Sequence, residues 1–195
     1  MCSSDLKYVI IADAANDIDE TNTFNPDDLI YISAASSEKG DGYRVQEVYK
    51  ADGKKTTMNV DESEYPALTA GFYAYDTNED GYYVLSEDVK ELTISDSKHV
   101  WKDEEGVLTG KNYVGMYEDL LSVEGAVDID VANAAFADVH DTDAQGQYDK
   151  TVSSLSALKN LVDNDKYTTT ATLALNVSED GAVTVFVTSL TRVAK

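Results

Sequence analysis

The sequence predicts a mainly β protein: two consecutive β-sandwich or barrel-like units of short antiparallel strands, with one amphipathic helix in the second unit. Three observations predict it. Short runs are rich in Val, Ile, Thr and Tyr, which fit a pleated, half-buried surface. Turn-forming residues, including Asp-Gly pairs, separate these runs at roughly regular spacing. The aromatic residues are 13 Tyr, 4 Phe and 1 Trp, and Tyr packs its ring while leaving its hydroxyl in water.

The first predicted unit covers residues 7–96. Within the run 42–50, alternate residues fall on opposite faces, with Gln46 and Val48 on one and Glu47 and Tyr49 on the other. The Asp52-Gly53 pair predicts a hairpin that joins this run to the next. The expected strands of this unit are 7–12, 29–35, 42–50, 56–61, 71–76 and 82–86.

The second predicted unit covers residues 97–195. Near-helical spacing of Met116, Leu120 and Val123 favours a helical turn within 115–123. The Asp180-Gly181 pair predicts a long final hairpin. A further hairpin is expected around Glu104-Glu105-Gly106 within 98–113, and the other expected strands are 126–132, 134–140, 168–178 and 182–193.

The clearest helix of the sequence is predicted over residues 153–164. Its apolar residues recur at helical spacing, and Ser153 or Ser154 is available as the N-cap. The apolar residues are Leu155, Leu158, Leu161 and Val162.

The chain is strongly acidic. Lys and Arg number 15 against 37 Asp and Glu, so the formal net charge is −22. A field of this sign repels phosphate backbones and anionic membranes, so it disfavours nucleic-acid and lipid-surface partners and attracts cations such as calcium. Apolar residues make up 43%, which is sufficient for a packed core. Since no run of about 18 apolar residues occurs, the sequence predicts no membrane span.

The six residues MCSSDL at positions 1–6 are interpreted as an artefact. With a GTG start they reverse-translate as GTG TGC TCT TCC GAT CT, which resembles the end of a common sequencing-library adapter. The hypothesis implies that the true protein extends further upstream, and that a leader peptide is not to be expected here. It also removes Cys2, the single cysteine, and with it disulfides, thiol catalysis and Cys-based zinc sites.

One segment satisfies the calcium-loop formula of EF-hands. Asp76, Asn78 and Asp80 alternate, Gly81 stands at the sixth position and Glu87 at the twelfth. EF-hand loops lie between helices, whereas the flanks here are Tyr- and Val-rich, so the context favours an acidic hairpin turn. A looser calcium site built from Asp76, Asn78, Asp80 and Glu87 is retained as a hypothesis, and no other cofactor is expected.

A second group of metal-ligand residue types spans residues 138–143, namely Asp138, His140, Asp141 and Asp143. Structural zinc sites gather ligands from separate elements, so a strand end that runs into a solvated acidic loop is the favoured interpretation. The other histidine, His99, lies beside Trp101 and is interpreted as packed or on the surface. With two His and no reactive Cys, a nucleophilic triad is not expected.

Several phrases resemble the β-modules of bacterial cell-surface proteins that contain S-layer homology domains. They are YVIIADA, YRVQEVYKADGKKTTMNVD, AGFYAYDTNEDGYYVL and AAFADVHDTDAQGQYDKTVSSLSALKNLV. The resemblance covers most of the chain from Lys7 onward. It implies a secreted protein associated with the cell wall or S-layer, with wall or surface-protein partners reached through further domains, and it supplies no functional residues.

The expected function is therefore a non-catalytic structural or display module of a surface protein, and no enzyme activity is expected. Two alternatives stay open. One is a calcium-assisted adhesin or glycan-binding module, and the other is an accessory part of a wall-active hydrolase, since an acidic chain always offers carboxylate pairs.

Overall fold

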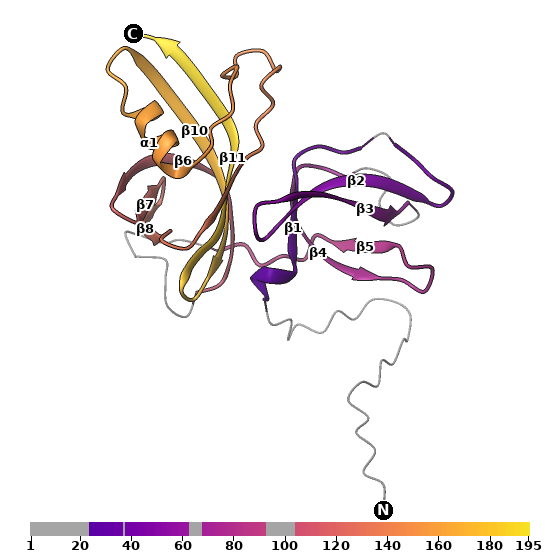
Figure 1. Cartoon of the computed structure of the whole chain (residues 1–195). Coiled ribbons are helices and arrows are strands. Elements are labelled where there is room, and N and C mark those ends of the chain that lie inside the picture. The colour runs from indigo at the N-terminus through magenta and orange to yellow at the C-terminus, as the bar shows by residue number, and fades with distance from the viewer. Residues whose placement is uncertain (1–23, 37, 63–67, 93–103) are drawn as a thin grey trace, which may run out of the picture.

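The computed structural model describes residues 24–36, 38–62, 68–92 and 104–195. Its described residues form two β-sheets that lie side by side, one from each half of the chain (Figure 1). The interpreted artefact at 1–6, the predicted strand 7–12, His99 and Trp101 lie outside the described residues.

The first sheet is a closed barrel with the strand order β1-β2-β3-β5-β4. A short 3-10 helix, η1 (Pro26–Asp28), leads into it. All pairs are antiparallel except β3 and β5, which meet in parallel at Val60 and Tyr83. The hairpin predicted around Asp52-Gly53 joins β2 to β3. The strands are β1 (Leu29–Ile32), β2 (Tyr43–Lys50), β3 (Lys55–Asp61), β4 (Gly71–Thr77) and β5 (Tyr83–Ser86).

The second sheet has six strands in the order β8-β7-β6-β10-β11-β9, and a single α-helix packs on it. The predicted final hairpin is β10–β11, and β9 pairs with β11 in parallel. The elements are β6 (Gly106–Tyr117), β7 (Leu120–Val123), β8 (Ala126–Asp130), β9 (Ala135–Asp138), α1 (Leu155–Val162), β10 (Tyr167–Ser178) and β11 (Gly181–Ala194).

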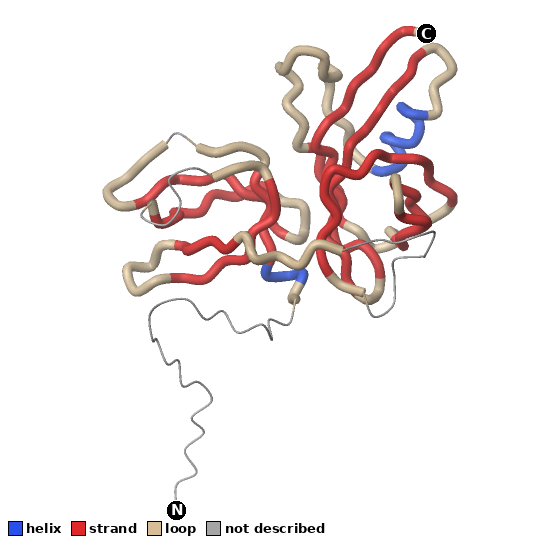
Figure 2. Tube along the Cα trace, turned by 180° about the vertical axis from the view of Figure 1, so that it is seen from behind, coloured by secondary structure: helices blue, strands red, loops and turns tan. Residues whose placement is uncertain are grey.

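The mainly β class, with two sheets and one helix near 153–164, is confirmed (Figure 2). Strand length differs from the expectation of short strands. β6 and β10 have 12 residues each and β11 has 14. These long strands form the central part of the second sheet. β10 pairs with β11 along its full length, and half of β10 also pairs with β6.

Helix α1 begins as its sequence predicts. Ser154 is the N-cap, and its hydroxyl accepts a 3.1 Å hydrogen bond from the backbone N–H of Ala157. Leu158 is fully buried against the sheet. Since α1 has eight residues, it is far too short and insufficiently apolar to cross a membrane, and no other α-helix occurs among the described residues.

The helical turn expected within 115–123 is wrong. These residues form the hairpin β6–β7, in which Tyr117 pairs with Leu120 across a tight turn at Glu118 and Asp119. Glu118 has a φ of 50°, the left-handed region that such hairpin turns require. Three apolar residues match a helix and a strand pair almost equally well, and pairing with the rest of the sheet decides between the two.

Three apolar clusters fill the molecule. The barrel interior holds the first, around Ile30, Val60 and Tyr73. The second lies between α1 and the inner face of the six-stranded sheet, around Leu108, Leu158 and Leu173. The third lies between the two units and takes residues from both, including Leu29 and Tyr31 from the barrel.

The inter-unit cluster is centred on Phe186 of β11. Its ring stacks on Tyr31 at 4.7 Å between centroids and an interplanar angle of 18°. Phe72 and Tyr49 approach the same ring edge-on at 5.8 and 6.0 Å. Offset and edge-to-face pairs of this kind add to the gain from burial, so the interface resembles a protein core.

Polar contacts surround these rings. The Asn176 side-chain amide donates to the Pro26 carbonyl at 2.7 Å, and the Thr184 hydroxyl donates to the Ala51 carbonyl. The β2–β3 turn lies close to the second unit at Gly53. A Cβ added to Gly53 would lie only 3.2 Å from the carbonyl oxygen of Phe136. Gly53 also has a φ of 72°, so both its backbone conformation and its neighbour favour glycine.

Candidate functional site

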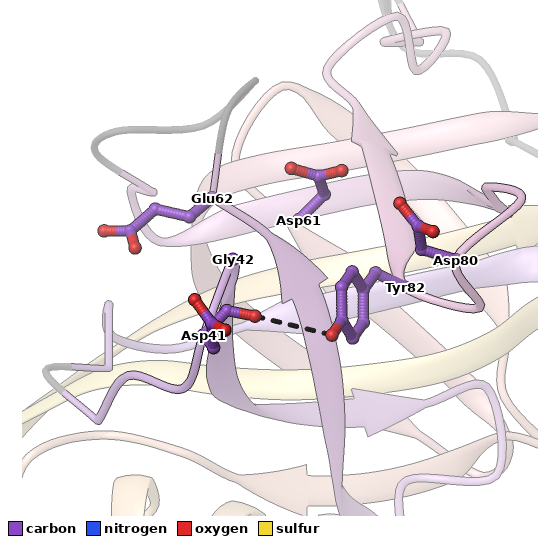
Figure 3. A pocket seen from close by; sticks show the side chains of 6 residues that line it. All are labelled: Asp41, Gly42, Asp61, Glu62, Asp80 and Tyr82. Atoms are coloured by element: carbon purple, nitrogen blue, oxygen red, sulfur yellow. Dashed lines mark hydrogen bonds between the residues drawn. The ribbon is translucent and has the colours of Figure 1, made fainter.

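A depression of about 700 Å³ lies at one end of the barrel (Figure 3). Three segments that are distant in sequence form it: the approach to β2, the end of β3, and the β4–β5 turn. Its lining is acidic with one aromatic ring. The lining residues are Asp41, Gly42, Asp61, Glu62, Asp80 and Tyr82.

Asn78 builds the turn that brings Asp80 and Tyr82 to the depression. Its side-chain oxygen accepts from the backbone N–H groups of Asp80 at 3.1 Å and Tyr82 at 2.9 Å. Its side-chain nitrogen donates to the Asp61 carboxylate at 2.7 Å, which ties the turn to β3. Gly81 supplies a φ of 80°. The Asn78 side chain therefore organises the hairpin turn.

The four predicted calcium ligands are spread along this hairpin. Asp80 lines the depression, while the Asp76 carboxylate accepts from the Thr77 backbone N–H at 2.7 Å. Asp76 pairs with Val84, and Glu87 follows the end of β5. Because the strands are antiparallel, Glu87 lies about three residues, or roughly 10 Å, further from the turn than the residue opposite Asp76.

The described residues contain no group of three or more His, Cys, Asp or Glu side chains placed to hold a metal ion. The segment is the β-hairpin turn that its flanks favoured, and calcium binding stays a prediction from the sequence formula.

Two of the lining carboxylates are engaged by the protein. Glu62 forms an ion pair with Lys39 and lies 3.6 Å from the Arg44 guanidinium. The hydrogen bond from Lys39 is the main cause that lowers the pKa of Glu62 below its ordinary value. Asp61 accepts from Asn78. For Asp41 and Asp80, the described part of the chain supplies no partner to the carboxylate, so both can accept hydrogen bonds from a ligand.

An aromatic pair flanks the acidic lining. The Tyr82 ring lies 5.0 Å from the Tyr43 ring at an angle of 35°, and the Tyr82 hydroxyl donates to the Asp41 carbonyl at 3.4 Å. Gly42, with a φ of 79°, lets the chain turn directly beside this ring. Sequence alternation places Tyr43 on a strand face, but its meeting with Tyr82 depends on how the barrel closes.

Asp138 and His140 are buried, with side-chain exposures of 2% and 0%. The His140 Nδ1 lies 2.5 Å from the Asp138 carboxylate, and Nε2 donates to the Tyr148 carbonyl at 2.9 Å. The other Asp138 oxygen accepts from the Val152 N–H at 2.6 Å. Both ring nitrogens are therefore occupied by protein, and the pair fastens the loop between β9 and α1.

The neighbouring acids take a different role. Asp141 is exposed and accepts from the Asp143 backbone N–H at 3.0 Å, as expected of a solvated loop. The sequence interpretation of a strand end and acidic loop holds for these two residues. The burial of Asp138 and His140 was missed, and an i, i+2 Asp–His pair at the end of a strand is the signal that points to it.

No known protein family, curated protein or solved structure matches this chain. The resemblance to S-layer homology domain proteins therefore stays an expectation that rests on the sequence phrases.

Proposed function

We propose that the chain is a non-catalytic structural module of a secreted, wall-associated bacterial surface protein, in which two β units form one rigid spacer. The observation that carries the proposal is the inter-unit cluster around Phe186. Neighbouring domains in one chain move relative to each other unless their interface is large and hydrophobic. A spacer requires that this motion be suppressed.

The contacts come from several separate segments. Besides the ring contacts of Phe186, the Asn176–Pro26 hydrogen bond ties β10 to η1, and the Thr184–Ala51 hydrogen bond ties β11 to the β2–β3 turn. Leu92 is also tied to β6, because its N–H donates to the Val107 carbonyl at 2.9 Å. Rotation of one unit against the other would break several of these contacts together.

Rigidity is tested by measuring the distance between the units in solution. Nitroxide labels at Glu47→Cys and Asp180→Cys, in a Cys2→Ser background, place one label on each unit. A single narrow distance distribution is expected, and Phe186→Ala should broaden it. A broad distance distribution in the labelled protein that keeps Phe186 would contradict the rigid spacer.

The location is tested separately by fractionating the bacterium that carries the gene and treating intact cells with protease. Recovery in the wall fraction and cleavage by external protease are expected. If the protein stayed inside the cells and survived the external protease, the proposed location would be contradicted. The rigidity measurement would be unaffected.

A second candidate, a glycan-binding module, is favoured by the acidic depression. Carbohydrate hydroxyls donate to carboxylates and pyranose rings pack on aromatic faces, and Asp41, Asp80 and Tyr82 offer these two features together. On a glycan array, any glycan bound by the parent chain should be lost with Asp41→Asn/Asp80→Asn. Asp180→Asn, in an exposed turn of the other unit, is the matched control.

The calcium-assisted form of this candidate is tested by calorimetry. Heat of binding and a rise in melting temperature at millimolar calcium, both lost with Asp76→Asn/Asp80→Asn, are expected if calcium assists. No heat and no shift would remove calcium from the proposal and leave metal-independent glycan binding to the array.

A further inference from the structure

The β10–β11 hairpin extends beyond the strands that flank it (Figure 1). β6 pairs with β10 only from Thr172 to Val177 and then turns away to pair with β7. On the other side, β9 pairs with β11 only from Thr184 to Val187. Residues 167–171 and 190–194 thus form a two-stranded extension, here named the distal ribbon.

The outer edge of β11 is covered only as far as Leu190. There the Tyr148 N–H donates to the Leu190 carbonyl at 2.6 Å, and the Leu190 N–H donates to the Gln147 side chain at 2.7 Å. In the described part of the chain, no strand pairs with Thr191–Ala194 on the side away from β10. Unpaired edges of this kind are templates for another strand.

The distal ribbon is held in shape by cation–π contacts of Arg192 and by a backbone hydrogen bond at its end. The Arg192 guanidinium lies 3.9 Å from the centre of the Tyr167 ring and 5.3 Å from that of Tyr148. The Lys195 N–H also donates to the Lys166 carbonyl at 3.2 Å across the end of the ribbon. A strand edge that is already ordered loses little conformational entropy when it pairs.

Charge distinguishes this edge from the others. The strand at the opposite edge, β8, carries Asp128 and Asp130, and the short strand β9 ends at Asp138. Charged residues on edge strands protect them from pairing with other chains. The ten residues of the distal ribbon include Arg192 as their single charged residue, in a chain of net charge −22.

The low charge of the β11 edge indicates which partner pairs with it. Contact between two copies elsewhere on the surface tends to bring carboxylates together, which like-charge repulsion opposes. The distal ribbon carries no carboxylate, which reduces this repulsion, and Val193 there is 66% exposed. We propose that the β11 edge at Thr191–Ala194 pairs antiparallel with the same edge of a second copy, so that the sheet continues across a twofold axis.

The test is sedimentation equilibrium of the full chain over a wide concentration range. A weak dimer is expected, and added salt should strengthen it by screening the net charge. Val193→Lys places like charges beside each other across the axis and should weaken association by on the order of tenfold or more.

Val114→Lys is a matched control, because Val114 on β6 is also 66% exposed. This control should leave association unchanged. Circular dichroism and the melting temperature verify that both variants keep the fold. In the parent chain, the backbone amides of residues 191–194 should exchange more slowly with deuterium as concentration rises.

Three outcomes would overturn the proposal. The first is a monomer at every concentration and salt level, and the second is equal weakening by both lysine variants. The third is loss of association with Ile10→Asp but not with Val193→Lys, which would assign the contact to the apolar segment 7–12. None of these outcomes bears on the rigid spacer, since the distal ribbon lies apart from the inter-unit cluster.

Discussion

The barrel and the six-stranded sheet are both β units, but they depend on the shared interface to different degrees. The second unit has its own large core beneath α1, with long strands that pair along most of their length. The barrel is built from four- to eight-residue strands, and its closing β3–β5 contact is a single residue pair. Small units bury a smaller share of their surface and are marginally stable alone.

Strand β1 shows how the barrel compensates. All four of its residues are buried, because Ile30 and Ile32 face the barrel interior while Leu29 and Tyr31 face the second unit. A strand covered on both faces reads as a continuous apolar run, here LIYI. The barrel is therefore completed by its neighbour, whereas the second unit has a large core of its own.

Phe186→Ala is expected to have the largest effect and to fall mainly on the barrel. It removes the ring that contacts Tyr31, Phe72 and Tyr49. The expected loss in the free energy of unfolding is about 3–5 kcal/mol. Hydrogen exchange read segment by segment should show more loss of protection in β1 and β4 than in β7 and α1.

The exposed substitution Val114→Ala is the control for this variant and should change stability by less than about 0.5 kcal/mol. Equal loss of protection in both units would contradict the dependence of the barrel on its neighbour.

Asp138→Ala is expected to damage the second unit and spare the barrel. It leaves the buried His140 Nδ1 without its carboxylate and the Val152 N–H without its acceptor. Removal of one partner of a buried pair costs roughly 3 kcal/mol. Chemical denaturation should record this loss, while Asp149→Ala in the same loop, at an exposed position, should be near neutral.

Alkaline pH tests the interface through Tyr31. Burial raises the pKa of Tyr31 to about 12, whereas a tyrosine in the unfolded chain ionises near 10. The unfolded state therefore loses this proton first. The contribution of Tyr31 to stability should be constant below about pH 10 and fall by roughly 2–3 kcal/mol as the pH rises toward 12.

Urea unfolding at several alkaline pH values measures that slope. Tyr31→Phe should reduce it, with the remainder due to Tyr113, whose pKa burial also raises to about 12. Tyr117→Phe is the control, since Tyr117 is 73% exposed. If the slope were the same in Tyr31→Phe and the parent chain, Tyr31 ionisation would not be linked to the interface.

Ser154→Ala should have the smallest effect, confined to α1. It removes the N-cap bond to Ala157 and should cost about 1 kcal/mol. Ser153→Ala, one residue earlier and exposed, controls for the loss of a hydroxyl. Thermal unfolding compares the two, and equal effects would contradict the assignment of the cap.

Local signals predicted much of the fold. Asp52-Gly53, Asp180-Gly181 and the flanks of Asp76 each indicated a hairpin that is present. The helical turn predicted within 115–123 is absent. Its few apolar residues fit both a helical and a strand period, and the pairing of β6 with β10 and β7 favours the strand.

The site was less predictable. The calcium formula reads Asp76 to Glu87 as one loop, but the antiparallel register of β4 and β5 separates its ends. Gln46 also shows what a local pattern leaves out. Alternation places Gln46 on the same strand face as Val48, and both side chains are buried. Its amide is satisfied there by the Ala34 carbonyl at 2.8 Å and the Ser36 N–H at 2.9 Å, which no local pattern shows.

The β class, the hairpins, α1 and the acidic surface can be predicted from the sequence, because they depend on residues within a few positions of one another. Long-range contacts are needed to cover β1 on both faces, to join the units through Phe186 and to bring Asp41, Asp80 and Tyr82 into one depression. These features arise from contacts between residues far apart in sequence. Strand order and register set them, and strands with the same alternation can satisfy many orders and registers.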